Sequence, residues 1–263
     1  MGDTPFREPV SLPPQDVADR AQLVRLPLKS GVVSRIQQAA ARRRRPLDTL
    51  GLAHELGDFR FVAAFAPDGA NRPRWQSALS SFVLIGGERP ALMGHTVHAL
   101  DTLRSIRLPD GWDEDPIEWE QAEATSLSQR LQRRSGRTVP FTVECSPHLR
   151  VVDPTKAPQG RRRNPRMREV DIARHMQAKN PDLTRAEAYG AWLSEQVQGA
   201  VVEAQSIRVM DESNQEVGNR TYQQIGIRLV GRLTVTDCSS LAQSLVRGIG
   251  RRRAYGLGML ALG

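Results

Sequence analysis

The sequence predicts an α+β fold in two halves, and three observations support this fold class. The second half reads as strand, helices, strand, strand, helix, glycine-rich loop and strand. This order is close to a ferredoxin-like sandwich with an arginine-rich helical insertion. The first half reads as strand, helix, strand, strand and helix, which fits a degenerate copy of the same plan. A basic turn at residues 133–137 separates the halves, so we expect an N-terminal domain at 1–137 and a C-terminal domain at 138–263.

The expected elements of the first half follow from local patterns. Several prolines oppose regular structure near the N-terminus. Ser30 is a favourable N-cap before apolar residues at helical spacing, and Pro46 stops that helix. In order, we expect an extended lead-in over 1–20, a strand over 22–28, a helix between Ser30 and Pro46, strands over 59–65 and 82–85, and helices over 93–106 and 118–134.

The second half carries stronger signals. Residues 139–145 alternate between apolar and polar, as in a half-buried strand. Thr184 and Glu187 form a capping box that opens a helix, and Gly199 stops it. The remaining expected elements are a helix over 169–179, strands over 200–209 and 225–235, and a last helix from Asp237 to Arg247 with Gly248 after it. The helical insertion is expected at about 156–199, and the glycine-rich loop at 248–258.

Composition limits the possible partners. A net charge of +8 and a pI near 10.4 indicate a polyanion, which could be RNA, DNA or an anionic membrane surface. The chain has no apolar run long enough to span a bilayer, and its first residues lack a signal-peptide core. Cys145 and Cys238 are too few for a disulfide framework, so we expect reduced cysteines and a cytoplasmic protein.

The positive charge is concentrated in three blocks. They are residues 42–45, residues 156–168 and the C-terminal loop, and arginine outnumbers lysine in all three. Arginine favours bidentate contacts with phosphate oxygens. A single run of arginines is usually a solvated face, but three runs that meet on one surface would form a binding groove.

The C-terminal loop places four glycines around three consecutive arginines. Glycines let a backbone turn sharply and approach a ligand closely, and we expect Gly250 and Gly256 to need this freedom. The loop is not a dinucleotide-binding motif, because it follows a helix and Arg253 stands where the third glycine would be. It is either a nucleic-acid-binding loop or a basic surface turn.

The C-terminal sequence resembles a known family. Residues 229–237 follow the pattern φ-x-G-x-L-x-V-x-D, and residues 248–260 follow G-φ-G-x-x-x-A-φ-G-φ-G-φ-L after a helix. Together they resemble CRISPR repeat-RNA-processing endoribonucleases of the RAMP superfamily, in particular the type I-E enzyme of Cascade. The likeness covers about residues 139–263. The arginine density also resembles the divergent type IV processing subunit, which carries an arginine-rich helical finger.

The resemblance implies two RRM-like ferredoxin domains in tandem that bind a hairpin of CRISPR repeat RNA (crRNA). It implies metal-independent cleavage by attack of the RNA's own 2′-OH, and continued binding as a subunit of the effector ribonucleoprotein beside other subunits. No cofactor or metal is therefore expected. His95 and His98 have a spacing found in zinc sites, but one such pair is weak evidence for a metal.

The candidate catalytic residues depart from the family's pattern. The family places a histidine in a Pro-aromatic-acidic-x-His setting, whereas Leu50 occupies that position in residues 46–50. His54 lies four residues further on. Arginine is a poor base but stabilises developing phosphate charge. The candidates are therefore His54 as acid or base, and Arg35 and Arg42 as site cations.

Two functions remain open, an endoribonuclease and a catalytically inactive RNA-binding scaffold of the same fold. A DNA-binding regulator ranks lower, because no helix-turn-helix signature is present. The residues expected to contact RNA are Arg43, Arg44, Arg45, Arg161, Arg162, Arg163, Arg166, Arg168, Arg247, Gly248, Gly250, Arg251, Arg252, Arg253, Tyr255, Gly256 and Gly258.

Overall fold

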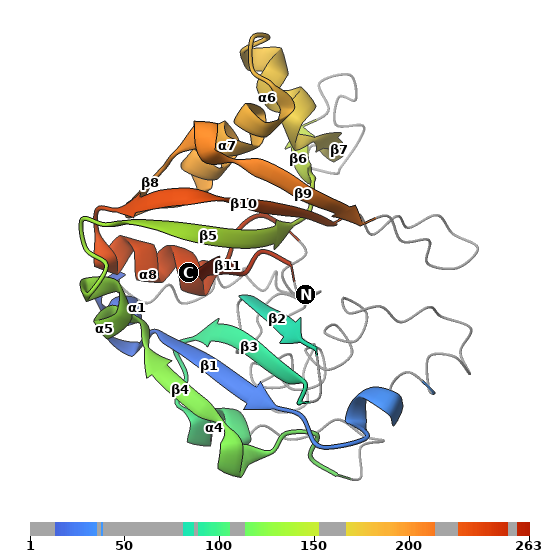
Figure 1. Ribbon diagram of the computed structural model, residues 1–263, viewed down its shortest axis with the longest axis vertical. Helices are drawn as coiled ribbons and strands as arrows, with labels where there is room; N and C mark the ends of the chain where they lie inside the picture. Colours follow the sequence, from blue (N-terminus) through green and yellow to red (C-terminus); the bar gives the residue numbers. More distant parts are fainter. Residues whose placement is uncertain are drawn as a thin grey trace, which may run out of the picture.

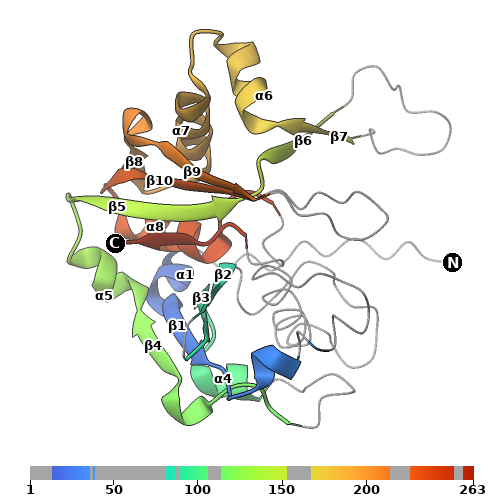
Figure 2. The ribbon, with the colours of Figure 1, turned by 45° about the vertical axis from the view of Figure 1, so that its right-hand side comes forward.

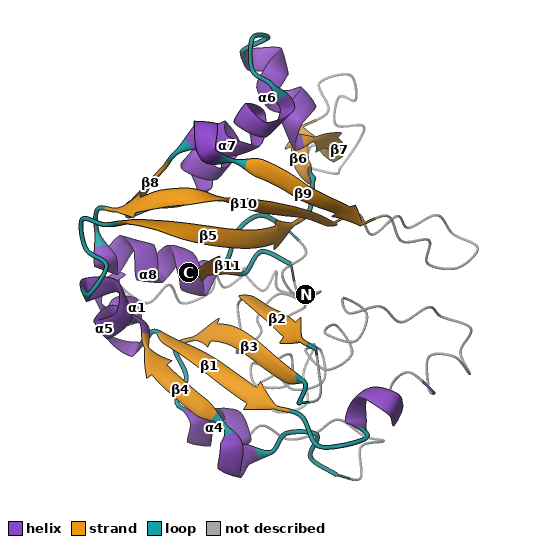
Figure 3. Ribbon diagram, in the orientation of Figure 1, coloured by secondary structure: helices purple, strands orange, loops and turns teal. Residues whose placement is uncertain are grey.

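Two antiparallel sheets form the framework of the protein (Figures 1 and 3). The structure is a computed structural model. It describes residues 14–35, 38, 81–86, 89–105, 114–152, 167–213, 226–251 and 257–263. The strand expected at 59–65 and most of the helix expected before Pro46 lie outside these residues.

The first sheet has the strand order of a ferredoxin-like domain. Its strands are β1 (Gln22–Pro27), β2 (Ser81–Ile85), β3 (Ala91–Thr96) and β4 (Glu123–Ser126). They lie in the order β4-β1-β3-β2, and every neighbouring pair is antiparallel. A helical turn at 32–35 follows β1, and helix α4 (Leu100–Arg104) follows β3.

The second sheet has the corresponding order, β11-β5-β10-β8. Its members are β5 (Thr138–Cys145), β8 (Ala200–Val202), β9 (Arg208–Ser213), β10 (Gly226–Val235) and β11 (Leu260–Leu262), with β9 also paired to β10. Helices α6 (Ile172–Lys179) and α7 (Arg185–Gln196) follow β5, and helix α8 (Cys238–Arg247) follows β10. The predicted α+β fold of two ferredoxin-like domains is confirmed.

Alternation along β5 and β10 separates the faces of this sheet. Side chains such as Val143 and Leu229 are fully buried, whereas Thr142 and Arg228 on the opposite face are exposed. The buried face forms one apolar core with α6, α7 and α8. A smaller core lies on one face of the first sheet, around Val24, Leu26 and Phe82.

Helix α8 connects the two halves. Helices α1 (Pro14–Arg20) and α5 (Leu127–Gln132) pack on it, as do strands β2 and β3 of the first sheet. Figures 1 and 2 show α8 between the sheets. Since α1 and α5 contribute to the larger core, the halves are not packed independently, and the boundary at residue 137 stays a prediction.

Several expected elements are wrong because tertiary packing overrides local signals. Residues 14–20 form α1 rather than an extended lead-in, since Val17 and Ala18 are buried and a proline is tolerated in a first helical turn. Residues 91–96 form β3 rather than a helix. This strand is central and mostly buried on both faces, so its sequence does not alternate.

Three further expectations need adjustment. The predicted helix over 118–134 is a 3₁₀ turn, a strand and a short helix, and the predicted strand over 200–209 is broken by a 3₁₀ turn at Ala204–Ser206. The helix expected from residue 169 begins at Ile172, because strand β7 (Met167–Asp171) pairs through Asp171. Among the residues described, no helix has the length and apolar character to cross a membrane.

Candidate nucleic-acid interface

The base of the glycine-rich loop is built on three glycines with positive φ. Gly248 (φ +70°) ends α8, and its N–H donates to the Ser244 carbonyl at 2.9 Å. Gly250 and Gly258 have φ of +72° and +85°. Side chains with a Cβ rarely adopt this conformation, so three left-handed positions shape the entry and exit of the loop. The expectation that Gly250 needs this conformational freedom is confirmed. Gly256 lies outside the described residues.

Hydrogen bonds close the loop at its base. The Ile249 N–H donates to the Gly258 carbonyl at 2.8 Å, and the Gly258 N–H donates to the Glu144 carbonyl of β5 at 2.6 Å. Ile249 and Leu257 are buried beneath this closure. The two ends of the segment 250–257 are therefore fixed in the core, at Ile249 and Leu257. Of the residues expected to contact RNA, Arg252, Arg253 and Tyr255 lie within it, beyond the described residues.

Helix α7 packs against the base of the glycine-rich loop. A Cβ built on Gly250 would lie 3.3 Å from the ring of Trp192, which is almost fully buried. The end of α7 is attached to α8, since Ser244 Oγ accepts from the Gln198 N–H at 2.8 Å. The backbone conformation at position 250 thus favours glycine, and a Cβ there would contact the indole closely.

The loop meets a hairpin that holds the second basic block. Strands β6 (His148–Val152) and β7 (Met167–Asp171) pair in this hairpin, which extends from the end of β5 (Figure 2). Arg251 Nη1 donates to Glu169 Oε1 at 2.9 Å, and Arg150 Nε lies 4.0 Å from the same oxygen. The structure therefore brings the glycine-rich loop and the hairpin together, although they are far apart in sequence.

The described part of the hairpin bears Arg168, whose side chain is exposed and whose contact with RNA stays a prediction. Arg247, also predicted to contact RNA, is exposed in the last turn of α8. The other arginines of the block are Arg161, Arg162, Arg163 and Arg166, and they lie in the undescribed connection between β6 and β7.

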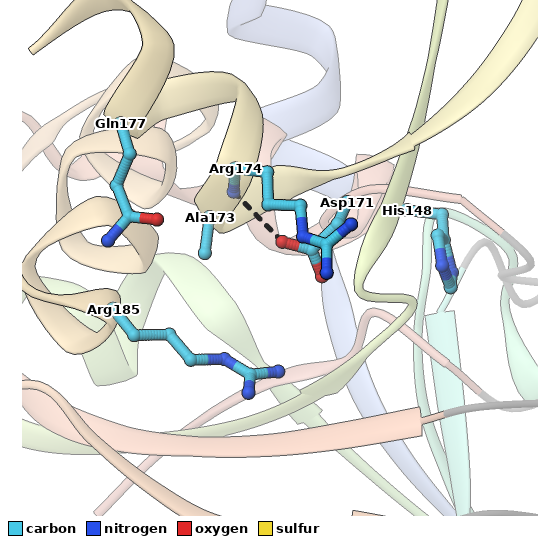
Figure 4. A pocket seen from close by; sticks show the side chains of 6 residues that line it. All are labelled: His148, Asp171, Ala173, Arg174, Gln177 and Arg185. Atoms are coloured by element: carbon cyan, nitrogen blue, oxygen red, sulfur yellow. Dashed lines mark hydrogen bonds between the residues drawn. The ribbon is translucent and has the colours of Figure 1, made fainter. Parts of the chain in front are cut away.

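An open pocket of about 520 Å³ lies where the hairpin meets α6 and α7. Figure 4 shows His148, Arg174 and Arg185 around it, together with Asp171. The Asp171 carboxylate caps α6 by accepting from the Arg174 N–H at 2.9 Å. Two guanidiniums and an imidazole against one carboxylate make this wall predominantly a donor surface for anionic groups.

The structure describes only one of the residues between 35 and 54 that the sequence predicts for catalysis or RNA binding. Arg35 is exposed in the helical turn after β1, and its Nη2 lies 3.9 Å from Glu114 Oε2. Arg42, Arg43, Arg44, Arg45 and His54 lie outside the described residues. The structure thus places Arg35 in an exposed ion pair, and its role beside a scissile phosphate stays a prediction.

The side chain of His95 is buried, and that of His98 is half-buried. His95 is buried on β3 and hydrogen-bonds to the backbone of Leu245 in α8. Burial lowers the pKa of His95 to about 4, with a smaller contribution from nearby Arg130. Burial also lowers the pKa of His98. His95 is therefore neutral near pH 7, and the described residues contain no cluster of three or more possible metal ligands.

Glu169, Arg150 and Trp192 belong to this interface and were not among the predicted site residues. For Glu169 a signal existed in the sequence, because it is the acid that ends the acid-free run up to Arg168. No local pattern identifies Arg150 or Trp192, since their neighbours come from distant segments.

The chain forms two ferredoxin-like domains in tandem, with a glycine-rich loop between the last helix and the last strand. A family model described as CRISPR associated protein matches residues 65–263, and the chain belongs to this family. A comparison with curated protein sequences finds no significant match.

Several solved structures of CRISPR proteins are similar to this chain. The CRISPR endoribonuclease Cse3 bound to a 19-nucleotide RNA is 18% identical with a TM-score of 0.51, over 92% of this chain and 99% of that one. Thermus thermophilus Cse3, bound to an RNA representing a pre-cleavage complex, is 20% identical with a TM-score of 0.49. Cas6e from Escherichia coli str. K-12 is 17% identical with a TM-score of 0.46. Each of these two comparisons covers 92% of this chain and 98% of the other.

Proposed function

We propose that this protein binds a hairpin of CRISPR repeat RNA, cleaves it, and stays bound to the product as a subunit of the effector ribonucleoprotein. The observation that carries the proposal is the meeting of the glycine-rich loop with the basic hairpin, in a chain of the CRISPR associated family. The shared fold with an RNA-bound CRISPR endoribonuclease supports it.

RNA binding would use phosphate contacts from two directions. The positive-φ glycines hold the loop backbone in a conformation that lets it approach the sugar–phosphate chain, with Arg251 at the start. The hairpin supplies Arg168 and the undescribed arginines before it. Guanidinium contacts to phosphates and 2′-hydroxyls read the shape of an A-form stem rather than its base edges. Tyr255 is the aromatic residue we expect to stack on a base.

Cleavage would proceed through the RNA's own 2′-oxygen. The 2′-oxygen forms a bond to the adjacent phosphorus, the bond from phosphorus to the 5′-oxygen breaks, and a 2′,3′-cyclic phosphate and a 5′-hydroxyl result. A base accepts the proton of the 2′-OH, and an acid donates a proton to the departing oxygen. We assign one of these two proton transfers, as acid or base, to His54, and stabilisation of the phosphorane to Arg35 and Arg42. No step in this scheme needs a metal ion.

A catalytically inactive RNA-binding scaffold is the second candidate. The observation that favours it is Leu50, which stands where the family's pattern has a histidine. This candidate shares every binding feature with the first and differs only in the acid or base.

Incubation of purified protein with its cognate repeat RNA in excess EDTA separates the two candidates. A single cut with a cyclic phosphate end establishes the enzyme, whereas RNA that is bound but intact establishes the scaffold. His54→Ala, Arg35→Ala and Arg42→Ala, each measured with RNA binding alongside, then assign the roles. Arg232→Ala, which removes an exposed arginine from the second sheet, is the matched control. If His54→Ala abolishes cutting while Arg35→Ala and Arg42→Ala both cut normally, the assignment of the arginines is wrong.

A further inference from the structure

Glu169 is an acid at the junction of two strongly basic elements. It lies on β7, directly after the acid-free block, and its carboxylate faces Arg251 of the loop and Arg150 of β6. Arg150 and Glu169 are cross-strand partners in the register of the hairpin. An acid here repels RNA phosphates, so RNA attraction alone does not explain its place.

We propose that Glu169 is a positioning residue, which joins the hairpin to the glycine-rich loop so that both meet RNA as one surface. The inference rests on the proposed RNA binding. It assigns Glu169 no contact with RNA; the residue acts through Arg251 and Arg150.

The geometry supports a role in orientation. A guanidinium is planar and has five N–H donors, so a bond from Nη1 to Glu169 restrains the plane and leaves other donors for a phosphate. The Arg251 side chain is 28% exposed, well below the 57% of Arg150, so it is held against the protein before RNA arrives. Ordering a long side chain in advance lowers the entropy cost of the later contact.

The hairpin needs a restraint of this kind. At its base, the Ile172 N–H donates to the Pro147 carbonyl at 2.8 Å, and Leu149 packs partly against the larger core. Glu169 lies further along the hairpin, toward the arginine block. A contact at Glu169 limits movement of β6 and β7 relative to the loop. Contacts at the base of the hairpin alone do not restrict this movement.

The test compares Glu169→Gln with Glu203→Gln. Glu203 is an equally suitable acid for a control, because its side chain is also 42% exposed and it pairs with an arginine, Arg232, at 3.8 Å. Both variants raise the net charge by the same amount. Without RNA, amide hydrogen exchange at 148–152, 167–171 and 248–251 should become faster in Glu169→Gln and stay unchanged in Glu203→Gln.

The direction in which RNA affinity changes distinguishes loss of positioning from a simple effect of charge. Removing an acid from a basic surface should strengthen binding if only charge matters, whereas loss of positioning should weaken it. We expect Glu169→Gln to bind the repeat hairpin about threefold more weakly than the parent at fixed salt, a size typical of exposed ion pairs. Glu203→Gln should bind equally well or more tightly.

A double variant checks that the effect passes through the loop. Adding Glu169→Gln to Arg251→Gln should cause no further loss of affinity, because the partner of Glu169 in the loop is already absent. Unchanged hydrogen exchange, or unchanged or tighter RNA binding by Glu169→Gln, overturns the proposal. If the parent protein binds no repeat RNA, the proposed function fails, while faster exchange in Glu169→Gln would still establish the link between hairpin and loop.

Discussion

At the scale of single residues, Gly250 combines a left-handed backbone conformation with a tightly packed neighbour. Its φ of +72° is unfavourable for side chains with a Cβ, and the Trp192 ring leaves a Cβ only 3.3 Å of space. The sequence allowed the conformational requirement to be predicted, because a glycine between a helix and an arginine run indicates a turn. Contact with Trp192 could not be predicted, since the two residues are far apart in sequence.

We expect Gly250→Val to lower the free energy of unfolding by about 1–3 kcal/mol and to weaken RNA binding more than this loss explains. The valine would shift the loop against Trp192 and so redirect Arg251. Chemical denaturation and RNA titration measure the two effects. Gly136→Val has a similar φ of +70° with open space around it, so it isolates the backbone cost. A Gly250→Val protein with parental stability and affinity would contradict the argument.

At the scale of elements, the sequence correctly predicts those structures that local interactions stabilise. The capping box of α7 is present, with the Glu187 N–H donating to Thr184 Oγ1 and the Thr184 N–H donating to Glu187 Oε2. The alternation of β5 and β10 was predicted correctly for the same reason. By contrast, α1 and β3 depend on burial against distant segments, and Glu169 gains its partner only when the hairpin meets the loop. No sequence window contains that information.

We expect Thr184→Ala to lower the free energy of unfolding by about 1 kcal/mol, because the first turn of α7 loses a cap. For a chain of this size the melting temperature should fall by about 2–4 °C. Thermal unfolding monitored by circular dichroism measures the change. Thr142→Ala, which alters an exposed threonine on β5, is the control and should have a smaller effect. Equal effects of the two variants would show that the cap does not stabilise α7.

At the scale of the whole molecule, α8 is the layer shared by both halves, and His95 reports on it. The imidazole is buried between β3 and α8 with a pKa near 4, whereas an unfolded chain binds its proton near 6.5. The unfolded state therefore takes up more protons between these values, so stability rises with pH across this window and falls as acid is added. His98, whose pKa is also lowered, acts in the same direction.

We expect the parent protein to lose up to about 3 kcal/mol of unfolding free energy through His95 as the pH falls from 6.5 toward 4. Denaturant unfolding at several pH values measures the slope. His95→Gln retains a hydrogen-bond donor for Leu245 but does not titrate in this range, so its slope should be smaller. If both proteins show the same slope between pH 6.5 and 5, His95 is not the source of the acid sensitivity.

The hairpin of β6 and β7 also has an evolutionary consequence. The chain leaves the core after β5 and returns to it at Ile172, so residues 153–166 join two strands that are already paired. A connection of this kind tolerates changes of length and sequence at a small entropic cost. Under the proposed function, the same segment would adapt the protein to a different repeat. Selection could then alter RNA preference in this segment while the two sheets and α8, which maintain the fold, stay the same.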